Sequence, residues 1–198
     1  PLPARLTQET DLVRAPVISV GNLAMGGRGK TPVVAHLARL LAARGEQPAI
    51  LSRGYRRRRP EPGVVIVSDG RRLGADLDRS GDEPLMLARL APGAAVLVCD
   101  VRATAAAVAE TTLGATVHLL DDGFQHRAMA RDIDIVLVTP ADLVGRRLPF
   151  GLLRSSVGAL ARADAVIVDG GPDEATTAHE APAATRASFE TKLNSNYK

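Results

Sequence analysis

Tryptophan is absent from this chain of 198 residues, and the aromatic residues together make up only 3% of it. A core must therefore be built from Val, Leu, Ile and Ala, which suits a buried parallel sheet. The single cysteine, Cys99, excludes an internal disulfide framework and fits a reducing compartment. No apolar run approaches the roughly 18–20 residues of a membrane span, and no signal peptide opens the sequence. We therefore expect any contact with a membrane to be peripheral.

The net charge is also small, at a formal value of +3. A small basic excess suits anionic partners such as nucleotides, phospholipids or nucleic acid, without choosing between them. Apolar residues make up 45% of the chain, which is within the globular range and argues against wholesale disorder. The length is sufficient for one domain with a core of its own and an appendage.

Apolar runs alternate with amphipathic stretches along most of the chain. Strands are expected at residues 16–20, 48–52, 64–67, 95–99, 117–120, 133–138 and 165–168. Helices are expected at residues 30–44, 82–90 and 102–111. This rhythm predicts an α/β fold in which a mostly parallel sheet is flanked by helices. After about Gly170 the sequence becomes rich in Ala, Thr and Pro and loses its periodicity, so we interpret the remainder as a linker or tail.

A glycine-rich segment joins the first expected strand to the first expected helix. Its core reads Gly26-Gly27-Arg28-Gly29-Lys30-Thr31. Glycines let backbone N–H groups approach phosphate oxygens, and the helix N-terminus adds a favourable dipole. Lys30 would reach the β- and γ-phosphates of ATP, and Thr31 would bind Mg²⁺. The segment therefore predicts a P-loop for MgATP, and its alternative is a glycine-rich turn before an ordinary helix.

Two neighbouring positions refine this interpretation. Ala24 stands where the usual P-loop motif has its first glycine. Partitioning and maturation ATPases share the Gly-Gly-x-Gly-Lys-Thr core but carry a second lysine just before the paired glycines. That position is Met25 here, which argues against a switch-type ATPase of this kind.

Two aspartates, Asp121 and Asp122, end an apolar strand downstream of the P-loop. A carboxylate at the carboxyl end of such a strand would face the Mg²⁺ beside the P-loop. Adjacent strand residues point to opposite faces, so the two should have different functions. We assign Asp121 to the metal and Asp122 to the catalytic network, although the residues alone leave the order open. A solvated Asp-Asp-Gly turn is the alternative.

Asp82 lies at the start of the second expected helix, in Ser80-Gly81-Asp82-Glu83-Pro84. A kinase needs a group that orients the acceptor hydroxyl near the γ-phosphate, and a carboxylate suits that function. An acidic residue at a helix start is also typical of an N-cap, so both interpretations remain open.

Three further features are candidates for anion contact. Arg53 follows the second strand and would lie at the same edge of the sheet as the P-loop. Residues 56–59 are an unbroken run of arginines, which could meet anionic lipid headgroups or be a solvated loop. Only Tyr55 provides an aromatic ring beside them, which disfavours nucleic acid. His126 is as well explained by a structural function as by a catalytic one.

Several blocks of the sequence resemble one known family. The segment from Val20 to Pro32 is similar to the nucleotide loop of the tetraacyldisaccharide 4'-kinases, which also lacks the first glycine. Further family blocks occur in the same order, namely Leu51-Ser52-Arg53-Gly54-Tyr55, Gly81-Asp82-Glu83-Pro84, Asp121-Asp122-Gly123-Phe124-Gln125-His126 and Leu148-Pro149-Phe150-Gly151-Leu152-Leu153-Arg154. The resemblance covers about residues 16–168.

The resemblance implies transfer of the ATP γ-phosphate to the 4'-hydroxyl of tetraacyldisaccharide 1-phosphate, a step of lipid A biosynthesis. It implies Asp82 as the base and Arg154 as a further phosphate contact. It also implies an acylated lipid acceptor and a peripheral position on the cytoplasmic face of the bacterial inner membrane. No nucleic acid and no obligate protein partner are expected.

The resemblance also implies a division of the chain. Residues 1–15 would be an N-terminal remnant, residues 16–170 the P-loop kinase domain, and residues 171–198 a linker or tail. The family has a second domain that supplies a histidine partner for the catalytic aspartate, and nothing after Gly170 resembles it. Ser155 and Ser156 replace the family's usual Glu and Pro. A truncated nucleotide-binding module without activity is therefore an alternative to the kinase.

Overall fold

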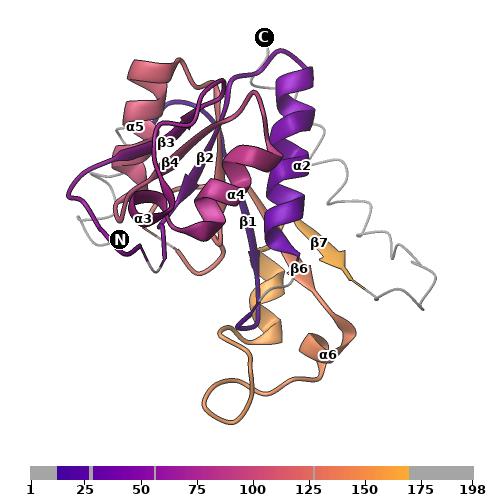
Figure 1. Ribbon diagram of the computed structural model, residues 1–198. Helices are drawn as coiled ribbons and strands as arrows, with labels where there is room; N and C mark the ends of the chain where they lie inside the picture. Colours follow the sequence, from indigo (N-terminus) through magenta and orange to yellow (C-terminus); the bar gives the residue numbers. More distant parts are fainter. Residues whose placement is uncertain (1–12, 27–28, 56, 127, 170–198) are drawn as a thin grey trace.

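A seven-stranded sheet forms the centre of the computed structural model (Figure 1), which describes residues 13–26, 29–55, 57–126 and 128–169. The strands lie in the order β3-β4-β2-β5-β1-β6-β7. Their bounds are β1 (Val17–Asn22), β2 (Pro48–Ser52), β3 (Val65–Asp69), β4 (Ala95–Val98), β5 (Val117–Asp121), β6 (Ile133–Val138) and β7 (Ala165–Val168). All neighbours are parallel except β3, which pairs antiparallel with β4 at one edge. The expected mostly parallel α/β fold is confirmed.

Helices cover both faces of this sheet (Figure 1). They are α2 (Lys30–Ala43), α3 (Leu77–Ser80), α4 (Asp82–Leu90), α5 (Arg102–Leu113), α6 (Pro140–Leu143) and the 3-10 helix η1 (Val157–Arg162). Ile50 packs in the cluster shared with α2 and α4, whereas its neighbour Leu51 packs in the cluster shared with α5. This alternation follows from the two-residue period of a strand and explains why β2 is buried throughout.

The helix α2 packs most of its large apolar side chains on the core, together with two alanines. The sequence places Val33, Val34, Leu37, Leu40 and Leu41 on one face of α2. In the structure Ala35 and Ala38 are buried and Leu40 is 38% exposed. Val34 is buried and Val33, Leu37 and Leu41 pack against the same cluster, so the expected face is confirmed except at Leu40.

A third apolar cluster lies below the carboxyl end of β1. It joins Leu23, Phe124, Val138 and Leu153, with η1 packed against it. Through this cluster the segment that follows α6 is anchored beside the P-loop. Within the described residues, no helix has the length and apolarity needed to cross a membrane.

Candidate active site

The P-loop lies between the end of β1 and the start of α2, as the sequence predicts. Gly29 precedes the helix with a φ of 70°, in the left-handed region that favours glycine. Lys30 and Thr31 form the first turn of α2, and both are buried. Gly27 and Arg28, predicted to contact phosphate, lie outside the described residues, as does Arg56.

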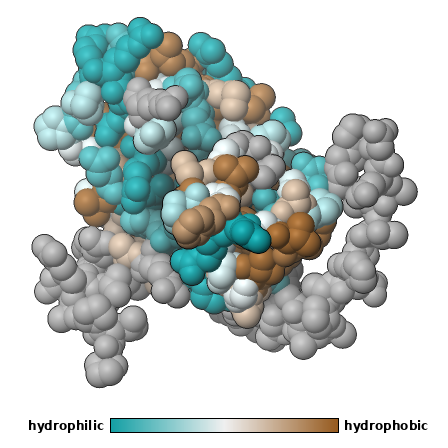
Figure 2. All heavy atoms as spheres, turned by 90° about the horizontal axis from the view of Figure 1, so that it is seen from below, coloured by the Kyte–Doolittle hydropathy of each residue, from teal (hydrophilic) through white to brown (hydrophobic). Residues whose placement is uncertain are grey.

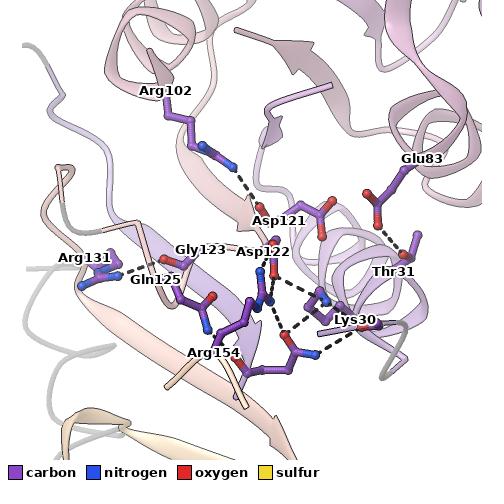
Figure 3. Close-up of polar contacts among 12 residues, drawn as sticks. Lys30, Thr31, Glu83, Arg102, Asp121, Asp122, Gly123, Gln125, Arg131 and Arg154 are labelled. Atoms are coloured by element: carbon purple, nitrogen blue, oxygen red, sulfur yellow. Dashed lines mark hydrogen bonds and ion pairs between the residues drawn. The ribbon is translucent and has the colours of Figure 1, made fainter. Parts of the chain in front are cut away.

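The ammonium group of Lys30 is surrounded by oxygen atoms (Figure 3). Its Nζ lies 3.3 Å from Asn22 Oδ1, 3.4 Å from Asp122 Oδ1 and 3.5 Å from the carbonyl oxygen of Gly26. Asn22 is fully buried at the end of β1 and also donates from Nδ2 to the Gly26 carbonyl, at 3.4 Å. Lys30 is therefore held at the mouth of the loop by a buried amide and a carboxylate.

Asp122 is paired with Arg154 as well as with Lys30 (Figure 3). The guanidinium of Arg154 donates to both carboxylate oxygens, at 2.9 Å and 2.7 Å, and to Asn22 Oδ1 at 2.6 Å. Burial would raise the pKa of Asp122, but Arg154 and Lys30 outweigh burial and the pKa is lowered. Asp122 is thus an ionised centre that holds two cations beside the P-loop.

Asp121 has the opposite environment, although it is the adjacent residue. Its side chain is buried, and Oδ1 has no hydrogen-bond partner among the described residues. Burial raises the pKa of Asp121 to about 7, with further contributions from the negative charges of Glu83 and Asp122. An unpaired buried carboxylate is costly unless a cation compensates it.

These oxygens fit a magnesium ion. Thr31 Oγ1 donates to Glu83 Oε1 at 3.2 Å, so a hydroxyl and a carboxylate already meet beside Asp121. Mg²⁺ prefers hard oxygen ligands and usually needs only one or two carboxylates, with waters and phosphates completing its shell. Accordingly, the described part of the chain contains no group of three or more His, Cys, Asp or Glu residues that could hold a metal alone.

Asp82 is exposed at the start of α4 and is not part of the ion network around Lys30. Gly81 occupies the N-cap position, with a φ of 86°, and Asp82 is the first helical residue. Its Oδ1 accepts a hydrogen bond from the backbone N–H of Glu83, at 3.0 Å. The carboxylate of Asp82 therefore faces solvent on the same helix start that brings Glu83 to the P-loop.

A second group of basic side chains lies beside the carboxyl ends of β2 and β5. Arg53 Nη2 lies 3.5 Å from His126 Nδ1. Arg102 is buried and donates to the carbonyl oxygen of Asp121 at 3.4 Å, while its Nε and Nη1 have no partner among the described residues. Burial lowers the pKa of His126 to about 4, and nearby arginines, Arg102 first, add to this effect. The neutral His126 and the two arginines leave net positive charge at this edge.

The similarity of the chain to known proteins agrees with the geometry of the P-loop site. A family model described as tetraacyldisaccharide-1-P 4'-kinase matches residues 4–198. The chain belongs to that family. Relatives named tetraacyldisaccharide 4'-kinase include one from Anaeromyxobacter sp. (strain Fw109-5), 50% identical over 153 residues, which are 76% of this chain and 41% of the relative. Another, from Desulfotalea psychrophila, is 47% identical over 157 residues, which are 78% of this chain and 45% of the relative.

A solved member of the tetraacyldisaccharide 4'-kinase family has the same fold. It is described as the "apo" form of LpxK from Aquifex aeolicus in complex with ATP, and it matches with a TM-score of 0.75 and 40% sequence identity. The match covers 84% of this chain and 52% of that one. The chain thus spans less than half the length of the two curated relatives and about half of the solved one.

Two residues at the centre of this kinase-family site were not predicted from the sequence. Asn22 contacts Lys30 and Arg154 through one side-chain oxygen, and its backbone carbonyl accepts a hydrogen bond from Gln125 Nε2 at 2.7 Å. Glu83 contacts Thr31 from α4. The available signals were their places inside the family blocks, at the end of the strand before the P-loop for Asn22 and next to Asp82 at a helix start for Glu83.

Proposed function

We propose that the protein transfers the γ-phosphate of ATP to the 4'-hydroxyl of tetraacyldisaccharide 1-phosphate, in lipid A biosynthesis. The observation that carries this proposal is the arrangement at the P-loop mouth, where Lys30 and Arg154 converge on Asp122. Beside it Asp121 is buried, and its Oδ1 has no partner among the described residues. Two cations and one uncompensated carboxylate are what a magnesium–triphosphate group requires. The solved relative described as a complex with ATP supports the nucleotide.

The residues divide the work of phosphoryl transfer between them. Lys30 and Arg154 would bind phosphate oxygens and stabilise the charge that develops during transfer. Thr31 and Asp121 would hold Mg²⁺, and Asp122 keeps both cations in place. The metal, when bound, supplies electrostatic stabilisation of the phosphate oxygens. Asp82, exposed at the start of α4 next to Glu83, would orient the acceptor hydroxyl and accept its proton.

The acceptor would bind along the edge that carries the exposed Arg53. The positive charge of Arg53, beside a neutral His126 and near the buried Arg102, suits the phosphate that the acceptor already carries. Because this acceptor is acylated, we also propose that the protein works as a peripheral protein at the cytoplasmic face of the inner membrane.

Phosphate transfer to the lipid tests the proposal directly. Radiolabelled ATP and tetraacyldisaccharide 1-phosphate should give a labelled lipid product, whereas ATP alone should be hydrolysed slowly. Lys30→Ala should reduce transfer by roughly 10²–10³-fold, the typical cost of losing one electrostatic contact in a transition state. Arg39→Ala removes an exposed charge from the same helix and should leave transfer unchanged.

Two other results would contradict the kinase proposal. ATP binding without any lipid product would favour a nucleotide-binding module that needs the rest of the family's length for transfer. ATP hydrolysis that a protein partner stimulates, with no labelled lipid, would favour a switch-type ATPase despite Met25.

A further inference from the structure

An apolar loop protrudes beside the site, and nothing in the proposed chemistry uses it. We call residues 143–152, between α6 and the segment anchored to the P-loop, the apolar tip. It is the loop at the bottom of Figure 1, and apolar side chains are visible at this end of the molecule in Figure 2. Val144 is 86% exposed and Phe150 84% exposed, and Leu143, Leu148 and Leu152 are also exposed.

Backbone hydrogen bonds hold the tip in shape. Leu148 N–H donates to the Leu153 carbonyl at 3.0 Å, Leu153 N–H to the Arg146 carbonyl at 3.1 Å, and Phe150 N–H to the Arg147 carbonyl at 2.9 Å. A side chain at Gly151 would collide with the Arg146 carbonyl, so this close turn requires glycine. The exposed apolar side chains are thus displayed by an ordered loop.

The base of the tip is attached to the P-loop. Met25 N–H donates to the Leu152 carbonyl at 2.8 Å, and Arg154 N–H donates to the Leu23 carbonyl at 2.7 Å. Beyond that, Arg154 pairs with Asp122 in the site itself. Whatever the tip contacts is therefore held at a fixed distance from the phosphate-binding residues.

The charges within the apolar tip favour an anionic partner. Arg146 and Arg147 are exposed within the tip, and no acidic partner for either guanidinium occurs among the described residues. By contrast, the basic run that the sequence suggested for lipid contact is largely neutralised, because Arg57, Arg58 and Arg59 form ion pairs with Asp100, Asp78 and Asp76. Apolar side chains beside unpaired arginines match the acyl and headgroup layers of an anionic bilayer.

We propose that the apolar tip docks the protein onto anionic membranes. Val144 and Phe150 enter the acyl boundary, while Arg146 and Arg147 remain at the level of the lipid phosphates. Because the tip is joined to the P-loop, docking places the site edge at the membrane surface, where an acylated acceptor would be found. This step rests on the proposed function, whereas membrane docking itself does not.

Because the sequence contains no tryptophan, an introduced tryptophan gives a fluorescence signal from one known position. Phe150→Trp introduces a single indole at the tip, and Leu73→Trp introduces one at an exposed position in the turn after β3. Vesicles of phosphatidylethanolamine and phosphatidylglycerol should shift the Phe150→Trp emission to the blue. Lipids brominated on their acyl chains should quench it, and the Leu73→Trp emission should not respond.

Serine variants separate the apolar and charged contributions. Val144→Ser with Phe150→Ser should weaken vesicle partitioning by about tenfold or more at any salt concentration. Arg146→Ser with Arg147→Ser should weaken it by about tenfold on anionic vesicles only, and mainly at low salt. The matched control, Leu73→Ser with Leu77→Ser, changes two exposed leucines elsewhere and should have no effect.

Two outcomes would overturn the proposal. One is partitioning that the tip variants leave unchanged, with no quenching of Phe150→Trp. The other is Phe150→Trp emission that is already blue-shifted and does not respond to vesicles, because another part of the protein then covers the tip. Neither measurement contains ATP or acceptor, so failure of docking is distinguishable from failure of phosphate transfer.

Discussion

Asp121 and Asp122 are chain neighbours with opposite electrostatic environments, which shows how local geometry assigns function at the residue scale. Asp121 is still part of β5, whereas Asp122 leaves the strand with a φ of 54°. The left-handed conformation turns Asp122 toward Lys30 and Arg154, whereas Asp121 stays buried, and its Oδ1 has no partner within the described part of the chain. The sequence established only that the two would differ, because strand alternation cannot say which carboxylate meets which cation.

Replacing Asp121 should stabilise the protein without metal. The folded-state pKa of about 7 lies above that of an unfolded aspartate, so folded Asp121 holds a proton that the unfolded chain lacks between about pH 4 and 7. The free energy of unfolding therefore falls as the pH rises through that window. Asp121→Asn removes this loss, so the free energy of unfolding should be higher than that of the wild type by roughly 2–4 kcal/mol near pH 8. Urea unfolding near pH 5 and pH 8, without Mg²⁺, measures the difference.

Asp122→Asn is the matched control for that experiment. The pKa of Asp122 is lowered, so its contribution to stability is present above the unfolded pKa and lost as the pH falls through the folded one. This variant should be destabilised near pH 8. Equal effects of the two substitutions would contradict the assignment of different environments.

Asp82→Asn tests the proposed base. Asparagine can occupy the exposed helix start but cannot accept a proton, so MgATP binding and stability should be retained. Phosphate transfer by a protein of the relatives' full length should fall by about 10²–10⁴-fold. Asp78→Asn, which removes a half-buried carboxylate that pairs with Arg58 and Arg59 from the neighbouring α3, is the control for charge. Near-normal transfer by Asp82→Asn would remove this residue from the mechanism.

At the scale of single elements, a buried pair joins the other end of β5 to α5. His118 is fully buried in β5, and its Nε2 lies 3.0 Å from Glu110 Oε1. The same Glu110 oxygen accepts hydrogen bonds from the backbone N–H groups of Arg14 and Ala15, each at 3.0 Å. The pair therefore also holds the segment that leads into β1.

His118 should make stability depend on pH. Burial lowers the pKa of His118 despite the neighbouring Glu110, so the folded protein keeps it neutral where an unfolded histidine gains a proton. The contribution of neutral His118 to the free energy of unfolding is fully present above about pH 6.5, and it is lost as the pH falls below that value. His118→Gln keeps a donor for Glu110 but cannot titrate, so its urea midpoint should change less between about pH 7.5 and 5.5.

The exposed His36 provides the control for this measurement. His36→Gln should keep the wild-type pH dependence, because it leaves the buried His118–Glu110 pair intact. If the urea midpoint changes equally with pH in the wild type and in His118→Gln, the His118–Glu110 pair is not the source of the pH dependence.

Element prediction succeeded where periodicity is long and failed where it is short. The expected helix at 82–90 coincides with α4, and the expected strand at 48–52 coincides with β2. The four-residue α3 and α6 and the 3-10 helix η1 were missed, because one turn carries no recognisable period. The antiparallel direction of β3 was also missed, since strand order and direction depend on contacts between distant parts of the chain.

For the whole molecule, the site is assembled from widely separated parts of the sequence. Asn22 comes from β1, Lys30 from α2, Glu83 from α4, Asp122 from the end of β5, and Arg154 from the segment below the sheet. Lys30, Asp122 and Arg154 were all predicted as site residues, and the structure brings these three together. Their partners Asn22 and Glu83 lie inside the family blocks, but the blocks do not reveal which side chains they contact, so only the folded chain identifies their function.

Such a site should couple nucleotide binding to the stability of the entire domain. A ligand that binds only the folded chain raises the free energy of unfolding with its concentration, by about 2.7 kcal/mol at about a hundredfold excess over Kd. For a chain of this size, that corresponds to a rise in Tm of roughly 5–10 °C. MgATP should therefore raise the Tm as one cooperative transition, and Lys30→Ala should lose most of the rise.

Arg39→Ala distinguishes loss of the site from a general change in α2. Arg39 is an exposed cation in the same helix, and its Nη1 donates to the carbonyl of Leu90 at 3.3 Å, away from the P-loop. The variant should keep the full MgATP-dependent rise in Tm, measured by calorimetry over a series of nucleotide concentrations. A rise that Lys30→Ala retains would place the nucleotide elsewhere. A third outcome is unfolding that splits into two transitions, of which MgATP raises the Tm of only one. That result would show that the elements contributing to the site unfold independently, because the ligand then stabilises only the elements that it contacts.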